Sequence, residues 1–307
     1  MGLIYHYTSC ASALSILRGH SLWFTDCEYL NDPSELLECY DLYNRAWAEA
    51  CKGHKEIGEL MGSVDVASIN PYKTESDTSE SDGLPARYYS FSASIDNSSV
   101  GIWSGYASQN GGGCILAFDQ NILEESLDEL SSVASQRGVS IGLLSGGVSY
   151  NQDQLVNEIK KCIQLSGNQF LELRSANLDL LDYVLASERI RAKFWSKIDD
   201  LAPFVKTSAY EYEQEHRIIL KIPDGQSLDS PEGEWAIRQG FRIGLCGAVT
   251  PYYEVVFPKE VIGSSLKTIY LMEPDGQSIG RRGMERLLVS LRYDHIAVND
   301  VNFKLRS

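Results

Sequence analysis

The sequence predicts an α+β fold from the distribution of its strand and helix patterns. Short runs of β-branched and aromatic residues, typical of strands, lie towards both ends of the chain. The middle, about residues 121–200, carries leucines at helical spacing, such as Leu178, Leu181 and Leu185. Strands and helices do not alternate regularly, which disfavours a doubly wound parallel sheet. We therefore expect one α+β domain over residues 1–307, with a helical segment near 121–200.

The N-terminal region begins with a strand, Leu3–Thr8, because β-branched and aromatic residues predominate in it. Ser9 can cap a helix that ends at Gly19, since serine accepts hydrogen bonds at a helix start and glycine tolerates the conformation of a helix end. A second strand is expected at Leu22–Thr25. Three residues then indicate the start of a long helix: Asp32 as N-cap, Pro33 at the first helical position and Glu35 in the first turn.

A polar segment near 68–86 interrupts this pattern. It is rich in Ser, Thr, Asp and Glu and holds few apolar residues, so we expect a mobile acidic surface loop. Arg87–Ser92 returns to strand composition, and Asp96–Ser99 can start a helix. After the glycines of Gly111–Gly113, the apolar run Cys114–Phe118 is typical of a buried strand.

The last third of the chain returns to strands. One strand is expected from Tyr210 through Ile222, because apolar residues follow a run of alternating charges. The remaining expected elements are strands at Val255–Val256, Thr268–Met272 and Ile296–Val301 and a helix near Gly283–Leu291.

The composition limits the possible partners. The formal net charge of −15 repels polyphosphate, which disfavours a protein that coats nucleic acid. Two cationic groups are local exceptions and could bind a substrate, although charges at such spacings are typical of a solvated helix face. These groups are Arg189, Arg191, Lys193 and Lys197 in one stretch and Arg281, Arg282, Arg286 and Arg292 in another.

The cysteines and the hydropathy indicate a soluble, cytoplasmic protein. Seven cysteines, an odd number, are scattered without a Cys-x-x-Cys pair or the spacing of a metal site, which is typical of reduced thiols. The chain has no run of eighteen apolar residues and no basic leader with a cleavage site. We therefore expect no membrane partner and no metal.

Two of the expected strands carry polar residues that could bind a ligand. Side-chain alternation places His6 on one face of the first strand. In the later strand it places Ser90 and Ser92 together, with Tyr89 on the opposite face. A lone strand histidine is usually a packed, hydrogen-bonded residue, and strand serines often face solvent. Each signal is therefore weak by itself.

A third segment concentrates carboxylates. In the expected strand after Tyr210, the residues Glu211, Glu213, Glu215 and Arg217 share one face, with successive carboxylates roughly 6–7 Å apart. Like charges repel, so this arrangement requires solvent, the neighbouring Arg217 or a functional reason. The alternative is a solvated edge strand that its charge protects from aggregation.

The order of these three segments resembles the ADP-ribosyltransferase superfamily, whose NAD clefts use a His or Arg, then a strand Ser or Tyr, then a Glu. The chain also resembles a widespread bacterial family of unknown function. The resemblance spans most of the chain and implies an ADP-ribosyltransferase-like split β-sandwich with a helical insertion in the middle. Six elements of that bacterial family stand here in the same order: His6–Ser9, Leu30–Glu35, Ser90–Ser92, Trp103–Tyr106, Gly111–Gly113 and Glu213–Arg217.

The resemblance also implies roles for individual residues, with NAD as the substrate. Glu215 would accept a hydrogen bond from the nicotinamide-ribose 2′-hydroxyl and stabilise the positive charge that develops as the glycosidic bond breaks. Glu213 would deprotonate or position the acceptor, and the choice of catalytic residue between the two stays open. The implied binding residues are His6 for a ribose hydroxyl, the backbone near Tyr7 for the carboxamide, Ser90 to orient the glutamate, Tyr89 or Tyr106 to stack on nicotinamide, and Thr8 and Ser92 beside them.

The implied activity is a mono-ADP-ribosyltransferase that modifies a nucleic-acid base or a protein side chain, in a toxin or phage-defence setting. Two alternatives stay open: an NAD glycohydrolase, and a non-catalytic module that binds a nucleotide or a protein. A metal-dependent nuclease is disfavoured, because the sequence has no compact His/Asp/Glu set with metal spacing and the net charge is negative.

Overall fold

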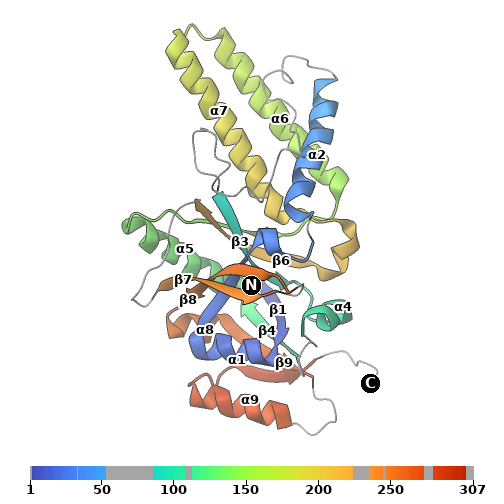
Figure 1. The fold of residues 1–307 in the computed structure, drawn as a ribbon, viewed down its shortest axis with the longest axis vertical. Helices are drawn as coiled ribbons and strands as arrows, with labels where there is room; N and C mark the ends of the chain where they lie inside the picture. Colours follow the sequence, from blue (N-terminus) through green and yellow to red (C-terminus); the bar gives the residue numbers. More distant parts are fainter. Residues whose placement is uncertain are drawn as a thin grey trace. The chain divides into compact units, whose positions relative to one another are not determined.

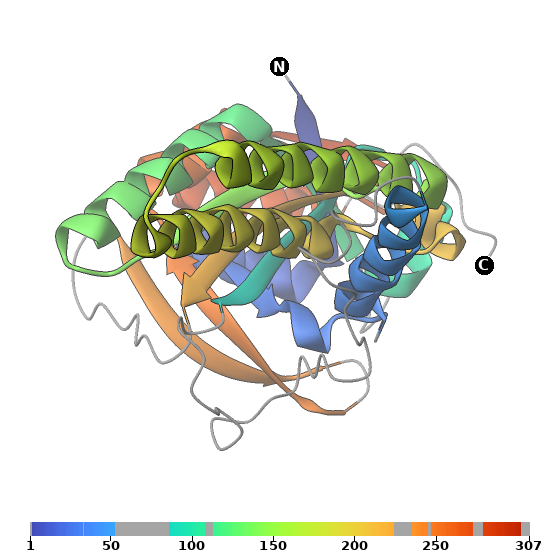
Figure 2. The ribbon, with the colours of Figure 1, turned by 90° about the horizontal axis from the view of Figure 1, so that it is seen from above.

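The structure, a computed structural model, divides into two compact units (Figures 1 and 2). We name them the sheet unit, which comprises Met1–Tyr29, Asp82–Gly147 and Ala209–Ser307, and the helical unit, which comprises Leu30–Ser81 and Val148–Ser208. Each unit is assembled from separate stretches of chain. The expectation of one catalytic domain over residues 1–307 stays a prediction. The residues that the structure describes are 2–32, 34–52, 86–107, 113–223, 235–244, 247–272 and 279–301.

The described residues of the sheet unit form a ten-stranded mixed sheet. The strand order is β10-β9-β4-β1-β3-β2-β8-β7, with β6 beside β3 and β5 beside β6. Strands β9 and β10 are parallel, and the other pairs are antiparallel. The α+β class is therefore confirmed. The strands are β1 Leu3–Ser9, β2 Ser21–Asp26, β3 Ala86–Ser94, β4 Gly113–Asp119, β5 Gly142–Gly147, β6 Glu215–Pro223, β7 Ala236–Ile243, β8 Val249–Val256, β9 Leu266–Leu271 and β10 Ala297–Asp300.

Helices α1, α5, α8 and α9 of the sheet unit all contribute apolar side chains to its main core. Ser9 caps α1 as expected, because its side chain accepts the N–H of Ser12 at 3.0 Å. Asp119 caps α5 in the same way through the N–H of Ile122. The helical elements of this unit are α1 Cys10–Gly19, a 3-10 turn at Cys27–Tyr29, α4 Val100–Ile102, a π-helical turn at Trp103–Ala107, α5 Gln120–Gln136, a 3-10 helix at Ser208–Glu213, α8 Lys259–Ser265 and α9 Ile279–Ser290.

Strand β4 is buried along its whole length and separates two apolar clusters. Leu116 and Phe118 join the main core on one face of the sheet, where Phe24 and Phe91 also pack. Ile115 points to the other face, into a smaller cluster around Trp103. The main core thus lies on one face, and the other face is left for polar side chains of β3 and β6.

The described residues of the helical unit form three long helices around a core of their own. α2 packs on α6, and α6 packs on α7. Buried side chains such as Tyr43, Ile159, Phe170 and Ile198 fill the space between them. In the described ranges no helix is long and apolar enough to cross a membrane. The elements are α2 Glu35–Cys51, α6 Gln152–Ser175, α7 Leu180–Leu201 and a 3-10 turn at Ala202–Phe204.

Most of the expected elements are present, and the differences are local. The expected helical segment near 121–200 contains α5, α6 and α7, but β5 at Gly142–Gly147 interrupts it. Strand β7 and helix α8 were not expected. The expected start of α2 at Asp32 is wrong, because the helix begins after Ser34 and Asp32 instead accepts the N–H of Ser34 at 2.9 Å. Pro33 and nearly all of the polar segment 68–86 lie outside the described residues.

Candidate active site

Strand β3 is the point at which the sheet forks. β6 pairs along the whole of β3, from Ala86 to Ser94, and therefore takes one of its two edges. The other edge is shared, because β2 pairs with β3 through Thr25 and Ser90 whereas β1 pairs with it through Tyr5 and Ser94. In the part of the chain that the structure describes, no strand pairs with this edge of β3 between those two positions. The fork leaves a backbone carbonyl of β3 accessible to a side chain.

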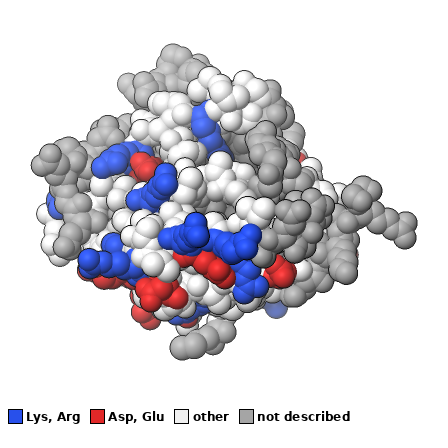
Figure 3. All heavy atoms as spheres, turned by 90° about the horizontal axis from the view of Figure 1, so that it is seen from below, with Lys and Arg blue, Asp and Glu red and all other residues white. Residues whose placement is uncertain are grey.

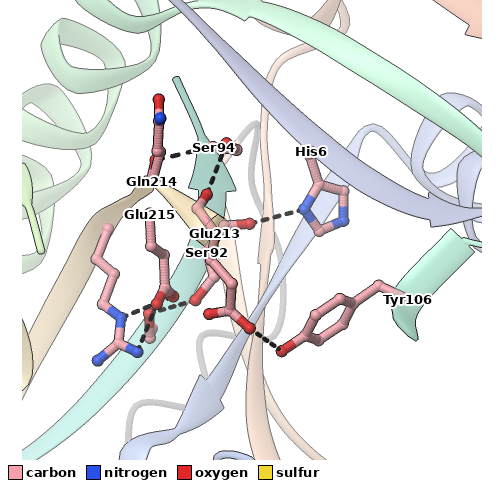
Figure 4. Close-up of polar contacts among 9 residues, drawn as sticks. His6, Ser92, Ser94, Tyr106, Glu213, Gln214 and Glu215 are labelled. Atoms are coloured by element: carbon pink, nitrogen blue, oxygen red, sulfur yellow. Dashed lines mark hydrogen bonds and ion pairs between the residues drawn. The ribbon is translucent and has the colours of Figure 1, made fainter. Parts of the chain in front are cut away.

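The imidazole of His6 lies in this fork (Figure 4). Its Nδ1 is 2.9 Å from the carbonyl oxygen of Ser92, and its ring stacks on Phe91 with centroids 4.7 Å apart. Because a carbonyl only accepts hydrogen bonds, Nδ1 carries a proton and Nε2 of the neutral ring is an acceptor. Burial lowers the pKa of His6, the hydrogen bond to Ser92 raises it, and the charge of Arg242 lowers it. The net shift is downward, so His6 is neutral near neutral pH and offers Nε2 to a hydroxyl donor.

The neutral state of His6 predicts a dependence of stability on pH. The pKa of His6 in the folded protein lies below its ordinary value of 6.5, so the unfolded chain takes up the proton first as the pH falls. The contribution of this residue to stability is fully present above the unfolded pKa. It is lost as the pH falls towards the folded pKa, at up to about 1.4 kcal/mol per pH unit.

We expect the variant His6→Gln to lose less stability than the wild type as the pH falls from about 7 to about 5. Glutamine does not titrate, yet its amide can still donate to the carbonyl of Ser92. Urea unfolding at each pH measures the difference, and parallel stability curves for the two proteins would contradict the assignment. His20 and His216, whose pKa values burial also lowers, are present in both proteins and cancel.

A polar strip runs along β3 and β6 on the face opposite the main core. Alternation puts Ser90, Ser92 and Ser94 on this face, and the hydroxyl oxygens of Ser90 and Ser92 lie 3.1 Å apart. In the β3–β6 register, Ser92 is opposite Arg217 and Ser94 is opposite Glu215. Directly opposite side chains on neighbouring strands touch, so the serines and the charged pair form one surface.

Glu213 reaches the same surface from a turn. It ends the 3-10 helix Ser208–Glu213, where its side chain is buried and its Oε1 accepts the hydroxyl of Tyr106 at 3.0 Å (Figure 4). Ser94 fixes the backbone of the turn, because its hydroxyl donates to the carbonyl oxygen of Glu213 at 2.7 Å. Ser94 therefore holds the backbone of Glu213 at the end of β3, and Tyr106 holds its carboxylate.

Tyr106 is positioned by a tight contact between its turn and β4. The turn is anchored by the buried ring of Trp103. A Cβ atom at Gly113 would lie 2.4 Å from the carbonyl oxygen of Ala107, so a side chain at this position would displace the turn. The last glycine of the expected Gly-rich turn thus has a steric role, while Gly111 and Gly112 lie outside the described residues.

Glu215 forms a buried ion pair with Arg217 two residues along β6. The Arg217 Nε donates to Oε1 of Glu215 at 2.7 Å and its Nη2 donates to Oε2 at 2.8 Å. Arg217 is 1% exposed and Glu215 is 8% exposed. Such a two-point contact fixes the orientation of the carboxylate.

The expected common strand face of three glutamates and Arg217 is wrong. Only Glu215 and Arg217 belong to β6, while Glu211 and Glu213 lie in the preceding 3-10 helix and Glu211 is exposed. Gln214 has a φ of 40°, in the left-handed region, which breaks the alternation between the turn and the strand. The repulsion expected among three carboxylates is relieved because each has a different environment.

The other expected binding residues are not all brought to the fork. The hydroxyl of Tyr7 donates to the carbonyl of Asp96 at 2.8 Å, and burial raises its pKa, so Tyr7 is a structural donor here. Thr8 is buried near the end of β1. Tyr89 lies in the main core, edge-on to Tyr253, on the side opposite Ser90. Of the two rings expected to stack on nicotinamide, Tyr106 is the one that contacts Glu213.

One cation beside the fork was not expected from the sequence. Arg242 lies on β7, a strand that was not expected, and donates from Nη2 to the Thr25 hydroxyl at 2.8 Å. Its signal in the sequence is an arginine between two apolar residues, Phe241 and Ile243, which is too common a pattern to indicate a site.

The two cationic groups found in the sequence belong to α7 and to the region of α9, where acidic residues accompany them. On α9, the side chains of Arg282 and Arg286 line a shallow hollow of about 290 Å³ together with Glu285 and Val289. Figure 3, which views the molecule from below, shows Lys and Arg side chains gathered on this face, with Asp and Glu side chains among them. Within the described ranges no group of three or more His, Cys, Asp or Glu side chains is arranged to hold a metal ion.

Comparison with known protein families gives a match over part of the chain. Residues 102–218 match the profile of a family described as "Protein of unknown function (DUF2971)". This range runs from α4 to β6 and contains Tyr106, Glu213 and Glu215, but neither His6 nor Ser90. No curated protein and no solved structure matches the chain. The chemistry of the fork therefore has to be argued from its own residues.

Proposed function

We propose that the fork in the sheet binds NAD and that the protein is a mono-ADP-ribosyltransferase acting on a nucleic-acid base or a protein side chain. The observation that carries the proposal is the convergence of the three segments that resemble the NAD cleft of that superfamily. His6 contacts the carbonyl of Ser92 at 2.9 Å, and Ser94 contacts the backbone of Glu213 at 2.7 Å. Segments far apart in the sequence thus meet within one short stretch of β3.

The topology of the sheet also supports the proposal. A split β-sandwich requires a sheet whose two halves diverge, and here β1 and β2 leave the same edge of β3 at different positions. A polar ligand can enter between the diverging strands, because their backbone groups are not used up by pairing. We therefore propose an ADP-ribosyltransferase-like split sandwich for the sheet unit, with the helical unit as the insertion.

The side chains at the fork suit the cleavage of NAD. His6 Nε2 accepts a hydroxyl of the adenosine ribose, and the ionised Glu215 faces the nicotinamide ribose through its 2′-hydroxyl. When the bond between C1′ and the nicotinamide nitrogen breaks, its electron pair leaves with nicotinamide, and the carboxylate stabilises the positive charge on the sugar. The acceptor then forms a bond to C1′ and gives up a proton, which Glu213 receives. Tyr106 hydrogen bonds to Glu213 and orients it for this step.

A cleavage assay tests the proposal. We expect the purified protein to release nicotinamide from NAD and to transfer labelled ADP-ribose to a macromolecule in a lysate. Separate protein and nucleic-acid fractions identify the class of acceptor. Free ADP-ribose without labelled product would make the protein an NAD glycohydrolase, and the absence of both nicotinamide release and transfer would exclude the proposal.

We also propose that the protein acts in the cytoplasm. All cysteines among the described residues are free thiols, as a reducing compartment requires. A toxin or phage-defence role remains a prediction of the resemblance.

A further inference from the structure

Arg242 is a cation at the fork whose hydrogen-bonding capacity is largely unused. A guanidinium has five N–H donors in a fixed planar arrangement. Here Nη2 donates to the Thr25 hydroxyl at 2.8 Å. Within the described part of the chain, no other hydrogen bond and no ion pair involves this guanidinium. The side chain therefore keeps donors for an anion from solution.

The guanidinium is held in place by its neighbours. Its central carbon lies 5.9 Å from the centroid of the Trp23 ring, which is the geometry of a cation–π contact. Trp23 in turn stacks on Tyr252 with centroids 4.4 Å apart and an interplanar angle of 23°. Because these contacts fix the long side chain before a ligand arrives, less conformational entropy is lost on binding.

The position of Arg242 links it to the polar strip of β3. Thr25, which accepts its hydrogen bond, is directly opposite Ser90 in the β2–β3 pairing. Opposite residues on neighbouring strands point to the same face, so Arg242 reaches over β8 to the face that carries Ser90 and Ser92. The charge of Arg242 also lowers the pKa of His6, so a ligand that contacts His6 is within range of this cation.

We infer that Arg242 binds the diphosphate of NAD, with Thr25 and Trp23 as the residues that position its guanidinium. The inference rests on the proposed function and assigns a subsite within it. Phosphate oxygens match the guanidinium in a two-point contact that few other anions provide as well. In NAD the diphosphate joins the two riboses. A contact of Arg242 with the diphosphate would therefore hold the adjacent ribose where its hydroxyl can donate a hydrogen bond to His6.

Isothermal titration of the full-length protein tests the subsite with three ligands: NAD, ADP-ribose, which keeps the diphosphate but lacks nicotinamide, and adenosine, which has no phosphate. We expect Arg242→Gln to weaken the binding of NAD and ADP-ribose by about tenfold to hundredfold, since charge-assisted hydrogen bonds to one anion are lost. The affinity for adenosine is expected to stay the same.

The matched control is Arg238→Gln, which removes the same charge from the same strand. Arg238 is exposed, as is Arg242, but it lies 3.9 Å from a carboxylate oxygen of Glu254, so its charge is already partnered. We expect Arg238→Gln to change the affinity for NAD by less than about twofold. An equal loss in both variants would mean that overall charge, and not a diphosphate contact, is responsible.

A second variant keeps the inference testable if Arg242→Gln does not fold. Arg242→Lys retains the positive charge and the long stem but loses the planar two-point contact, so we expect an intermediate loss of affinity. Unchanged affinity for NAD and ADP-ribose in both variants would overturn the inference.

The outcomes separate this inference from the proposed function. If the wild type cleaves NAD and Arg242→Gln binds it normally, the subsite is wrong and the function stands. If the wild type binds NAD and ADP-ribose through Arg242 but releases no nicotinamide, the subsite stands and the activity is wrong. If the wild type binds neither ligand, both are overturned.

Discussion

Replacing Glu215 with glutamine is expected to lower the free energy of unfolding by roughly 3 kcal/mol, because the guanidinium of Arg217 would lose the carboxylate that it contacts at two points inside the protein. Arg217 is 1% exposed and donates two short hydrogen bonds, at 2.7 and 2.8 Å, to Glu215. A neutral amide can accept a single hydrogen bond but cannot balance the charge. Urea unfolding monitored by circular dichroism measures the loss.

The control for this prediction is Glu211→Gln, which removes a carboxylate only four residues away. Glu211 is exposed, so its substitution is expected to change stability by less than about 0.5 kcal/mol. The double variant Glu215→Gln/Arg217→Met removes both charges of this ion pair and should recover part of the stability. If Glu215→Gln were as stable as the wild type, the buried ion pair would not hold the strand together.

The activity of Glu215→Gln has to be measured where the variant is folded, because the substitution is also expected to lower stability. A loss of activity in Glu215→Gln could arise from a disturbed β6 as well as from a missing carboxylate. Measurement at a temperature and denaturant concentration where the variant is folded is therefore required. Under those conditions we expect both nicotinamide release and transfer to be abolished, because the charge on the sugar is no longer stabilised.

Glu213→Gln is expected to lower the rate of transfer to the acceptor by about 100-fold or more, which is the usual contribution of a positioned general base. Stability is expected to change little. In the wild type the hydroxyl of Tyr106 donates to Oε1 of Glu213 at 3.0 Å, and the amide oxygen of glutamine can still accept this hydrogen bond. Nicotinamide release to water is expected to persist, since Glu213 acts on the acceptor and not on the sugar.

Comparison of kcat for transfer and for NAD hydrolysis tests this division of roles. Tyr106→Phe leaves Glu213 intact but removes its hydrogen bond, so a smaller decrease in transfer is expected. Transfer at the wild-type rate in Glu213→Gln would remove the residue from the mechanism. Equal loss of hydrolysis and transfer would assign to Glu213 the role proposed for Glu215.

The elements that local chemistry specifies could be predicted from the sequence. Three features depend only on residues close together in the chain: the Ser9 cap, the apolar run of β4 and the helical spacing of apolar residues in α6 and α7. Strand β5 was missed because three of its six residues are glycine, which lacks a side chain to indicate a strand. Strand β7 was missed because polar and apolar residues do not alternate in it.

The error over Glu211–Arg217 has a specific physical cause. Charges at every second position fit a strand, but they also fit a 3-10 turn followed by a strand when one residue adopts a left-handed conformation. Gln214 is that residue, and glutamine gives no sign of it in the sequence. The separate environments of Glu213 and Glu215 could therefore not be predicted.

The convergence at the fork also lay beyond sequence reasoning. Side-chain alternation correctly placed Tyr89 and Ser90 on opposite faces of their strand. The residues of a strand do not, however, indicate which other strands it will pair with. The contact of His6 with Ser92 depends on the registers of β1 and β2 against β3, which are set by packing across the whole sheet.

The long-range strand pairing has a consequence for synthesis of the protein in a cell. Strand β2 emerges from the ribosome early, yet its partner β8 follows much later, since the hydrogen-bonded Ser21 and Glu254 are 233 residues apart. High contact order slows folding, and unpaired strands remain open to association with other chains during the wait. We expect nascent chains to need chaperones, and prematurely terminated products to be insoluble and inactive.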